Sequence, residues 1–371
     1  MTKQLRIAYL CGTNGWGGLE MNQLKNAIWM QERGHFVKLY CLENSPIHKA
    51  TVENNLPCGI IQKHKNHYDL IKAFNLLRLL KKDNIEHLIF RATFDQSIAA
   101  TISFLSHRKI KVHYFMEMKF GAPKKQFFRT LRYMYFSSWN CPLEYLKNQV
   151  LENSKVNPEK VNVIASGLDL TTVSQNDKIT SRKLLNLPPT DFLFGIVGRI
   201  DPKKGQLYAL KATQLLSDYK FKLVIVGEET PDAPSSYLKE IKAFIEANKL
   251  EEKILFLPFQ KNPMDVFNAF DWTLMTSDSE TFGMVTIESM AQGTPVIGSN
   301  AGGTSELLDF GNAGLLFETK NEIDLAEKMK LALEKKTPFE LTTFRNSISK
   351  FNSNEVCEKV EKMLKSRKSN V

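Results

Sequence analysis

Two glutamates carry the most suggestive chemistry in this sequence. Glu280 and Glu288 enclose the stretch ETFGMVTIE, in which a Phe-Gly pair follows the first carboxylate. A glycosidase pair, a metal site and a nucleotide-sugar site would each use such residues, whereas a capped amphipathic helix with a solvated Glu288 needs no function. The preceding DWTLMTSDSE predicts a strand and MVTIESMAQ predicts a helix. We therefore expect Glu280 in the strand-to-helix loop and Glu288 about one turn inside the helix, which is not the geometry of a glycosidase pair.

A run of backbone amides follows Glu280. Gly283 lets the backbone approach a ligand closely, and the first N–H groups of a helix have no helical acceptor. These amides belong to Phe282, Gly283, Met284 and Val285. They would hold hydroxyls or phosphate oxygens, while Glu280 accepts hydrogen bonds from hydroxyls and Glu288 takes a ribose diol.

A metal site is an alternative for the same segment. Asp278-Ser279-Glu280 resembles the D-x-D motif of metal-dependent sugar transferases. A hard divalent cation needs several oxygen ligands, and no third ligand stands nearby with an obvious spacing. We therefore expect no metal and no cofactor.

Two cations follow the first predicted strand of the second half, DFLFGIVG. In VGRIDPKKGQ, Arg199 and Lys204 flank a turn that contains Asp201-Pro202. The carboxyl end of such a strand faces the crevice in which α/β sheets bind ligands. Arginine offers a planar bidentate contact and lysine a point charge, so the pair suits a diphosphate. A solvated basic turn is the alternative.

A glycine-rich loop, GTNGWGG, follows the first strand of the chain, RIAYLC, and opens a helix. Its glycines do not have the G-x-G-x-x-G spacing of a dinucleotide site, and Glu43 matches the acidic residue of that motif only loosely. An NAD site stays open as an alternative. In either case the glycines let backbone N–H groups approach an anion at a helix N-terminus.

Strand and helix patterns alternate along both halves of the chain, and the alternation restarts near residue 191. The expected strands are 6–11, 36–42, 87–91, 111–116, 191–198, 222–227, 253–258, 271–275 and 294–298. This pattern predicts an α/β fold of two tandem doubly wound, Rossmann-like domains. We place the first domain at 1–167, the second at 168–349 and a final helix at 350–371.

Bulk properties narrow the class of protein. The 371 residues are 43% hydrophobic and 24% charged, as in ordinary globular proteins. The five cysteines form no C-x-x-C pair, which argues against a zinc site or a disulfide framework and favours a reducing cytoplasm. No apolar run reaches the ~18–20 residues of a membrane span. The net charge of +10 leaves nucleic acid, anionic lipid and phosphorylated small molecules as partners.

The motifs of the second half occur in a specific order. VGRIDPKKGQ, VIVGE, ETFGMVTIE and AQGTPVIG together resemble the C-terminal half of family 4 glycosyltransferases, which are retaining, group 1 type enzymes with the GT-B fold. GLDL at 167–170 resembles the interdomain stretch of the family, and the N-terminal glycine loop matches more loosely. The resemblance covers most of the chain. It implies two domains that face each other across a cleft, with the final helix packed back on the first domain.

The resemblance also assigns roles to residues. Arg199 and Lys204 would bind the donor diphosphate, Glu280 and the amides of 282–285 would hold the transferred sugar, and Glu288 would bind the nucleotide ribose. No divalent metal is implied, because the arginine and lysine neutralise the leaving diphosphate.

The first domain departs from the family pattern. The resemblance implies that Gly17 and Gly18 bring the backbone to the phosphates. Many members also carry a histidine that faces the sugar, but HYFMEMKFG has Met116-Glu117-Met118 at that place. Glu117 or Arg91 is the candidate for part of that role, on the acceptor or sugar side, and His113 is expected inside a strand.

Residues 119–136 mix lysines and arginines with aromatic side chains. If they form one helix, this composition suits the surface of an anionic membrane, although a core helix with a solvated basic face would look the same. Stacking on nucleic acid would also suit it, but the sugar-donor motifs argue against that partner.

The sequence therefore predicts a cytoplasmic, retaining, metal-independent glycosyltransferase, peripheral on the inner face of the plasma membrane. It would move a hexose-type sugar from a nucleotide-sugar donor to a glycan or lipid-linked acceptor, in the synthesis of a surface polysaccharide or glycolipid. Another sugar-nucleotide enzyme of the same fold, such as an epimerase, and an inactive nucleotide- or glycan-binding protein remain the alternatives.

Overall fold

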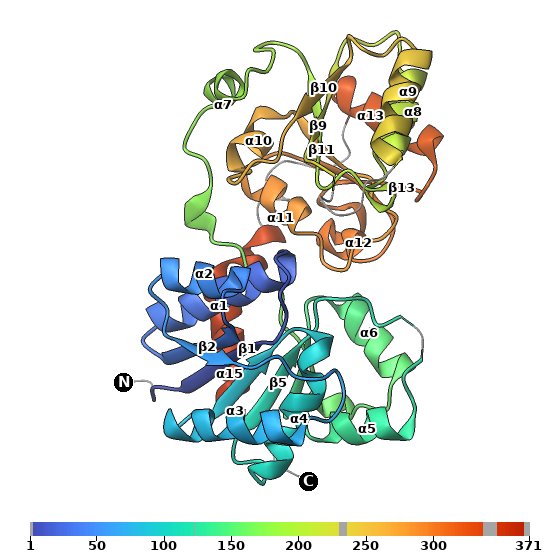
Figure 1. Cartoon of the computed structure of the whole chain (residues 1–371). Coiled ribbons are helices and arrows are strands. Elements are labelled where there is room, and N and C mark those ends of the chain that lie inside the picture. Colours follow the sequence, from blue (N-terminus) through green and yellow to red (C-terminus); the bar gives the residue numbers. More distant parts are fainter. Residues whose placement is uncertain (1–2, 122, 230–235, 337–346, 367–371) are drawn as a thin grey trace. The chain divides into compact units, whose positions relative to one another are not determined.

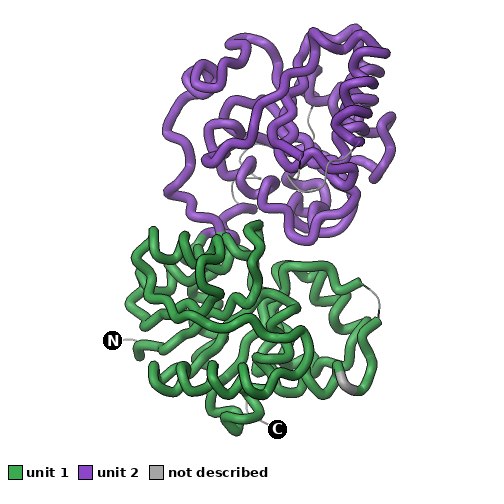
Figure 2. Tube along the Cα trace, in the orientation of Figure 1, with its two compact units in different colours: residues 1–167, 353–371 green, residues 168–352 purple. Residues whose placement is uncertain are grey.

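The computed structural model describes residues 3–121, 123–229, 236–336 and 347–366. The chain divides into two compact units, shown in Figure 2. Unit 1 comprises residues 1–167 and 353–371, and unit 2 comprises residues 168–352. Each unit is built on one parallel sheet with helices on both faces (Figure 1).

The sheet of unit 1 contains seven parallel strands among the described residues. In sheet order they are β3 (Cys58–Ile61), β2 (Phe36–Leu42), β1 (Arg6–Cys11), β4 (His87–Phe90), β5 (Lys111–Phe115), β6 (Ser138–Cys141) and β7 (Val161–Val163). The strand order reverses direction between β1 and β4. The loops that follow these two strands therefore diverge and leave a crevice at the carboxyl edge of the sheet.

Alternate residues of each strand enter different cores, because successive side chains point to opposite faces of a sheet. Ile7 and Tyr9 pack with α1 (Gly18–Glu32), α2 (Pro46–Glu53) and α15 (Ser353–Lys365). Ala8 and Leu10 belong to the core on the other face. The helices of that face are α3 (Leu70–Lys82), α4 (Gln96–Leu105), α5 (Phe127–Met134) and α6 (Glu144–Asn153).

Unit 2 has six parallel strands among the described residues. In sheet order they are β10 (Ile254–Leu257), β9 (Lys222–Val226), β8 (Leu193–Val197), β11 (Trp272–Met275), β12 (Val296–Ser299) and β13 (Leu315–Phe317). Its helices are α7 (Lys178–Leu184), α8 (Gln206–Leu215), α9 (Tyr237–Ala247), α10 (Met264–Ala269), α11 (Met284–Ala291), α12 (Thr304–Leu307) and α13 (Glu322–Leu333). The strand order reverses between β8 and β11, which places the ligand crevice of this unit beside the loops that follow them.

Short 3₁₀ helices complete the described chain. They are η1 (Thr93–Asp95), η2 (Pro158–Lys160), η3 (Leu170–Thr172), η4 (Pro202–Lys204), η5 (Asp309–Gly311) and η6 (Ser349–Phe351). Among the described residues, no helix is both long and apolar enough to cross a bilayer.

The two-sheet α/β architecture expected from the alternating pattern is confirmed. The sequence prediction missed four strands, β3, β6, β7 and β13, each of only three or four residues. Segments such as SWNC and VNV are too short and too polar to show a strand pattern. The helix expected within 119–136 is also shorter than that segment: α5 begins at Phe127, Pro123 lies in the loop before it, and residue 122 lies outside the described residues.

α15 joins unit 1 through one apolar face and one acidic residue. Val356, Val360 and Leu364 are buried in the core that contains β1. Glu361 accepts a hydrogen bond from Arg33 Nε at 2.6 Å, and its carboxylate also lies 3.2 Å from Lys365 Nζ. Burial alone would raise the pKa of Glu361, but the hydrogen bonds from Arg33, Lys365 and His35 lower it to about 2.

This pKa predicts an acid-sensitive attachment of α15. A carboxylate with a depressed pKa stabilises the fold above its unfolded pKa, and the stabilisation is lost as the pH falls from ~4.3 to about 2. Between pH 6 and pH 2.5, wild-type protein should lose about 2 kcal/mol more of its unfolding free energy than Glu361→Gln. Urea denaturation followed by circular dichroism measures both. Glu358→Gln changes an exposed neighbour on the same helix and should lose as much stability in acid as wild type. If Glu361→Gln also lost as much as wild type, the depressed pKa would not belong to Glu361.

Candidate functional site

The loops after β8 and β11 meet at the point where the strand order of unit 2 reverses. The first contains Arg199 and Lys204, and the second runs from Thr276 to Gly283. Thr276 Oγ1 donates to the carbonyl of Lys204 at 2.8 Å, and Asp278 N donates to the carbonyl of Lys203 at 3.0 Å. These bonds fix the two loops against each other at the carboxyl edge of the sheet.

Gly205 makes this close approach feasible. Its φ of +72° lies in the left-handed region, which residues with a side chain avoid. A Cβ at this position would lie 2.2 Å from the carbonyl oxygen of Thr276. The glycine after Lys204 is therefore required by the neighbouring loop as well as by its own backbone.

Lys204 and Glu280 form an ion pair across the two loops. Lys204 Nζ lies 2.6 Å from Glu280 Oε1, and Ser277 Oγ donates to the same oxygen at 2.6 Å. The side chains are 31% and 16% exposed, respectively. A lysine charge and a hydroxyl donor on one oxygen hold Glu280 in one position while leaving the pair open to a ligand.

A third loop, after β12, positions the backbone of Glu280. Gly303 N donates to the carbonyl of Glu280 at 2.9 Å, and Ser299 Oγ donates to the carbonyl of Ser277 at 2.7 Å. No role was predicted from the sequence for this loop, AGGTSEL. In the structure it fixes the segment that carries the carboxylate.

Gly283 is the N-cap of α11, with the four expected amides around it. Phe282 is buried and packs edge-on against Phe351, with ring centroids 5.7 Å apart, which anchors the start of the helix. Met284, Val285 and the side chain of Glu288 are half-buried, and Glu288 lies in the second turn of α11. The amides and Glu288 therefore follow Glu280 on the same edge, as expected from the sequence.

Arg199 is exposed, in contrast to the paired Lys204. Gln206 Nε2 donates to its carbonyl at 2.8 Å, so the backbone is fixed. Within the described ranges of the chain, no hydrogen bond or ion pair of the guanidinium is found. Its five donors remain available to an anion.

Unit 1 brings Arg91 and Glu117 together at the carboxyl ends of β4 and β5. Arg91 is buried and Glu117 is half-buried, and Arg91 Nη1 donates to Glu117 Oε1. Glu117 also accepts from Ser166 Oγ at 3.0 Å and, more weakly, from Asn22 Nδ2 at 3.5 Å. Arg91 Nε is buried without a partner among the described residues. Gly17 and Gly18 lie at the start of α1, on the same edge of this sheet.

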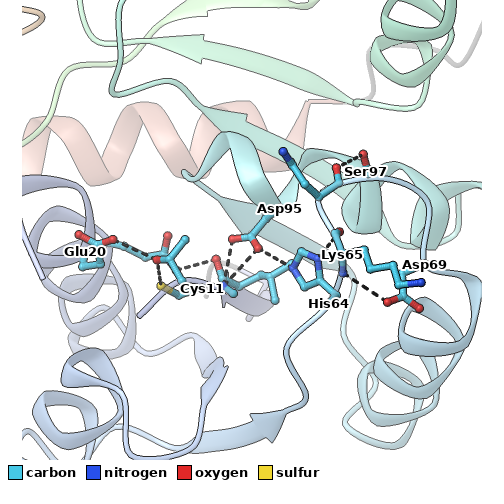
Figure 3. A network of polar contacts seen from close by, with 12 residues as sticks. Cys11, Glu20, His64, Lys65, Asp69, Asp95 and Ser97 are labelled. Atoms are coloured by element: carbon cyan, nitrogen blue, oxygen red, sulfur yellow. Dashed lines mark hydrogen bonds and ion pairs between the residues drawn. The ribbon is translucent and has the colours of Figure 1, made fainter. Parts of the chain in front are cut away.

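A buried network that the sequence prediction missed holds the glycine loop of unit 1 (Figure 3). Asp95 accepts from Gly12 N at 3.1 Å and from the ring of His64, whose Nε2 lies 2.9 Å away. A Cβ at position 12 would lie 2.3 Å from Asp95 Oδ1, so only glycine fits there. Thr13 Oγ1 then donates to Glu20 at 3.1 Å, which ties the loop to α1.

The protonation of His64 follows from its partners. Burial alone would lower the pKa of His64, but its hydrogen bonds to Asp95 and to the carbonyl of Lys65 raise it above the ordinary value. The ring stacks on Phe94 at 4.5 Å between centroids. In the sequence, the only hint of this network was an acidic residue, Asp95, shortly after a strand end. Its partner His64 lies 31 positions away, so no local sequence pattern could have predicted the contact.

Comparison with known proteins identifies one part of the chain directly. Residues 177–355 match the family model described as glycosyl transferases group 1. The matched range covers nearly all of unit 2, which is similar to this family. The Lys204–Glu280 pair, Arg199 and the N-terminus of α11 all lie within this range.

A curated relative matches about half of the chain. The D-inositol 3-phosphate glycosyltransferase of Rhodococcus jostii (strain RHA1) is 33% identical over 189 residues, which cover 48% of this chain. The match covers 41% of that relative, so the chain spans about two fifths of its length.

Solved structures match the fold over nearly the whole chain. A glycosyltransferase from Rickettsia africae ESF-5 aligns with a TM-score of 0.84 at 17% identity and covers 98% of both chains. Anabaena HepE in complex with UDP and glucose aligns with a TM-score of 0.82 at 19% identity, covering 98% of this chain and 100% of that one. The fold is therefore that of GT-B glycosyltransferases.

The lack of space for a side chain at Gly205 gives a direct test of the contact between the two loops. Gly205→Ala should lower the unfolding free energy by about 2–4 kcal/mol, because it adds a clash with the Thr276 carbonyl to the cost of a left-handed alanine. Gly311→Ala is the matched control, since Gly311 also has a positive φ but a Cβ there would meet no atom within 4 Å; it should lose only about 1 kcal/mol. Urea denaturation measures both. Equal losses would show that the two loops do not depend on this contact.

Proposed function

We propose that the protein is a retaining glycosyltransferase that transfers a hexose-type sugar from a nucleotide-sugar donor. The observation that carries this proposal is the convergence of Lys204, Glu280 and the N-terminus of α11 at the point where the strand order of unit 2 reverses. The group 1 glycosyltransferase domain at 177–355 supports the same function.

Charge development in the reaction explains why these groups are needed. When the bond between the sugar and the diphosphate breaks, negative charge grows on the diphosphate. Arg199 is exposed and free to move onto it, and Lys204 is already fixed 2.6 Å from Glu280. A cation that is already fixed, as Lys204 is, stabilises a growing negative charge without having to reorganise, whereas Arg199 is ordered only when the diphosphate binds.

Glu280 serves the sugar in this proposal. Its carboxylate is held by Lys204 and Ser277, and it has capacity to accept further hydrogen bonds from sugar hydroxyls. Positive charge develops at the anomeric carbon as the bond lengthens, so a nearby carboxylate binds the transition state more tightly than the ground state. The amides of Phe282 to Val285 hold oxygens of the donor, and Glu288 accepts from the ribose.

No metal or cofactor is required in this scheme. Arg199 and Lys204 supply the positive charge that a divalent cation would otherwise give to the diphosphate. Within the described part of the chain, no cluster of three or more histidine, cysteine or acidic residues has the arrangement of a metal site.

We assign the acceptor to unit 1. Arg91 and Glu117 offer a buried cation and a carboxylate at the carboxyl edge of its sheet, where hydroxyls of an acceptor would be oriented. The acceptor is a glycan or a lipid-linked precursor of a surface polysaccharide or glycolipid. The basic and aromatic segment 119–136 would place the enzyme on the inner face of the plasma membrane. In this segment Phe127 and Met134 are exposed.

Kinetics of two matched variants test the donor site. Glu280→Gln keeps the shape of the side chain and removes its charge, so it should lower kcat by roughly 10²–10³ with a smaller effect on the donor KM. Glu288→Gln should mainly raise the donor KM, because the ribose lies away from the bond that breaks. Steady-state rates with one nucleotide-sugar donor measure both effects.

The same assays carry two controls. Thermal melting should show both variants folded, so that a lost rate reports the site and not the fold. Wild-type activity should persist in EDTA; complete loss in chelator, restored by magnesium or manganese, would overturn the metal-free scheme. A near wild-type kcat for Glu280→Gln would mean that Glu280 has no role in the reaction and that ETFGMVTIE is only the start of a capped helix.

A further inference from the structure

A second pocket lies in unit 1, away from the residues assigned to sugar transfer. Its volume is about 370 Å³. It is lined by the first residues of β5 and β6, by the connection between α5 and β6, by residues near η2 and by the last turns of α15. The amino ends of β5 and β6 lie on the opposite edge of the sheet from Arg91 and Glu117. The pocket is therefore distinct from the proposed acceptor site.

The lining of this pocket is strongly cationic. One acidic side chain, Glu159, contributes to it among the described residues. Its basic side chains are Arg108, Lys111, Lys160, Lys359 and Lys362. Clefts lined by charges of one sign concentrate ligands of the opposite sign.

Three of these cations have no acidic partner in the described part of the chain. Lys160 Nζ donates to the backbone carbonyl of Met134 at 3.2 Å, and Arg108 lies over the ring of Tyr135, 5.7 Å from its centroid. Lys111 appears in no ion pair of the described residues. Burial, and then the charge of Arg108, lower the pKa of Lys160. The five cations of this lining outnumber its one carboxylate, Glu159. Their mutual repulsion is costly for the fold, and an anion in the pocket would reduce it.

The loop that carries Arg108 is the turn that ends α4. His107 and Arg108 have φ values of +51° and +60°, as residues after the C-terminus of a helix often do. His107 N donates to the carbonyl of Phe104 at 3.0 Å and Arg108 N to the carbonyl of Ser103 at 2.8 Å. These bonds fix the position from which Arg108 contributes to the lining.

Neutral polar side chains and apolar side chains, such as Phe136, Val163 and Met363, form the rest of the lining. His113 and Ser138 are buried, and His113 Nδ1 lies 2.8 Å from Ser138 Oγ. Burial, and then the nearby charges of His87 and Lys111, lower the pKa of His113, so this ring stays neutral. Both ring nitrogens of His113 are already paired, with His87 and Ser138. The hydroxyl of Ser137 and the amide of Asn157, which also line the pocket, are the groups that can pair with the hydroxyls of a sugar or polyol.

We propose that this pocket binds a small phosphomonoester, such as a sugar phosphate. The volume falls within the ~300–1,000 Å³ of small-molecule sites, which is more than one phosphate group needs. The cations would hold the phosphate, and the neutral polar groups would hold the hydroxyls. The competing explanation is that the cations only stabilise the C-termini of α4, α5 and α15, where helix dipoles favour positive charge.

Binding assays on the full chain separate these explanations. Isothermal titration with glucose 6-phosphate should show saturable binding to wild-type protein. Lys111→Gln/Lys160→Gln should weaken it by about tenfold or more, because charge-assisted hydrogen bonds to phosphate are lost. The charge-matched control Lys49→Gln/Lys81→Gln, at exposed positions of the same unit, should bind like wild type.

Two further variants test whether the measured binding takes place in this pocket. Arg199→Ala should bind the sugar phosphate unchanged, which excludes the diphosphate site of unit 2 as the source of the signal. Arg108→Gln alone should also weaken binding, and it serves if the double variant does not fold. Undiminished binding in both Arg108→Gln and the double variant, or no binding by wild type, would overturn the proposal of a soluble sugar phosphate.

Vesicles distinguish the two sources of a phosphomonoester. Sedimentation with phosphatidic acid in phosphatidylcholine tests a lipid headgroup. Failure of glucose 6-phosphate to bind, together with vesicle binding that the double variant loses, would assign the pocket to a lipid phosphate. The vesicles could also bind wild type, Arg108→Gln and the double variant equally well, or bind none of the three. Either result would leave only the helix-dipole explanation.

Discussion

The candidate donor site depends on the close approach of two loops that follow neighbouring strands, β8 and β11. Gly205 lacks the Cβ that would meet the Thr276 carbonyl. Hydrogen bonds from the Thr276 hydroxyl and from the backbone N–H of Asp278 then hold the loops together. Only with this contact does Lys204 come within 2.6 Å of Glu280. The parallel sheet supplies the junction, because β8 and β11 are paired strands whose loops leave the same edge of the sheet.

Unit 1 uses the same principle with different chemistry. Its glycine loop is held at Gly12 by a buried carboxylate, Asp95, which is itself held by His64. No Cβ fits between them. In both units, a glycine next to a strand end lets a polar group fix a loop at the carboxyl edge of the sheet. The buried polar network costs desolvation, which its hydrogen bonds offset.

Local patterns were sufficient for the main elements and for the place of Glu280 before, and Glu288 inside, α11. The apolar strands β1, β2, β8 and β9 and the helix after Gly283 follow from periodicity and from a glycine at a helix start. The strands β6 and β7 did not, because their pairing in the sheet, and not their composition, makes them strands. The contacts Lys204–Glu280 and His64–Asp95 join residues 76 and 31 positions apart, so tertiary structure alone reveals them.

The central claim is that Lys204 and its loop junction bind a nucleotide-activated sugar. A thermal-denaturation panel of nucleotide sugars on wild type and Lys204→Met tests it most directly. At about 100 times its dissociation constant, a bound donor adds ~2.7 kcal/mol to the stability of the folded protein. At least one nucleotide sugar should raise the melting temperature of the wild type and leave that of Lys204→Met nearly unchanged. Absence of stabilisation by every donor, or equal stabilisation of both proteins, would contradict the account.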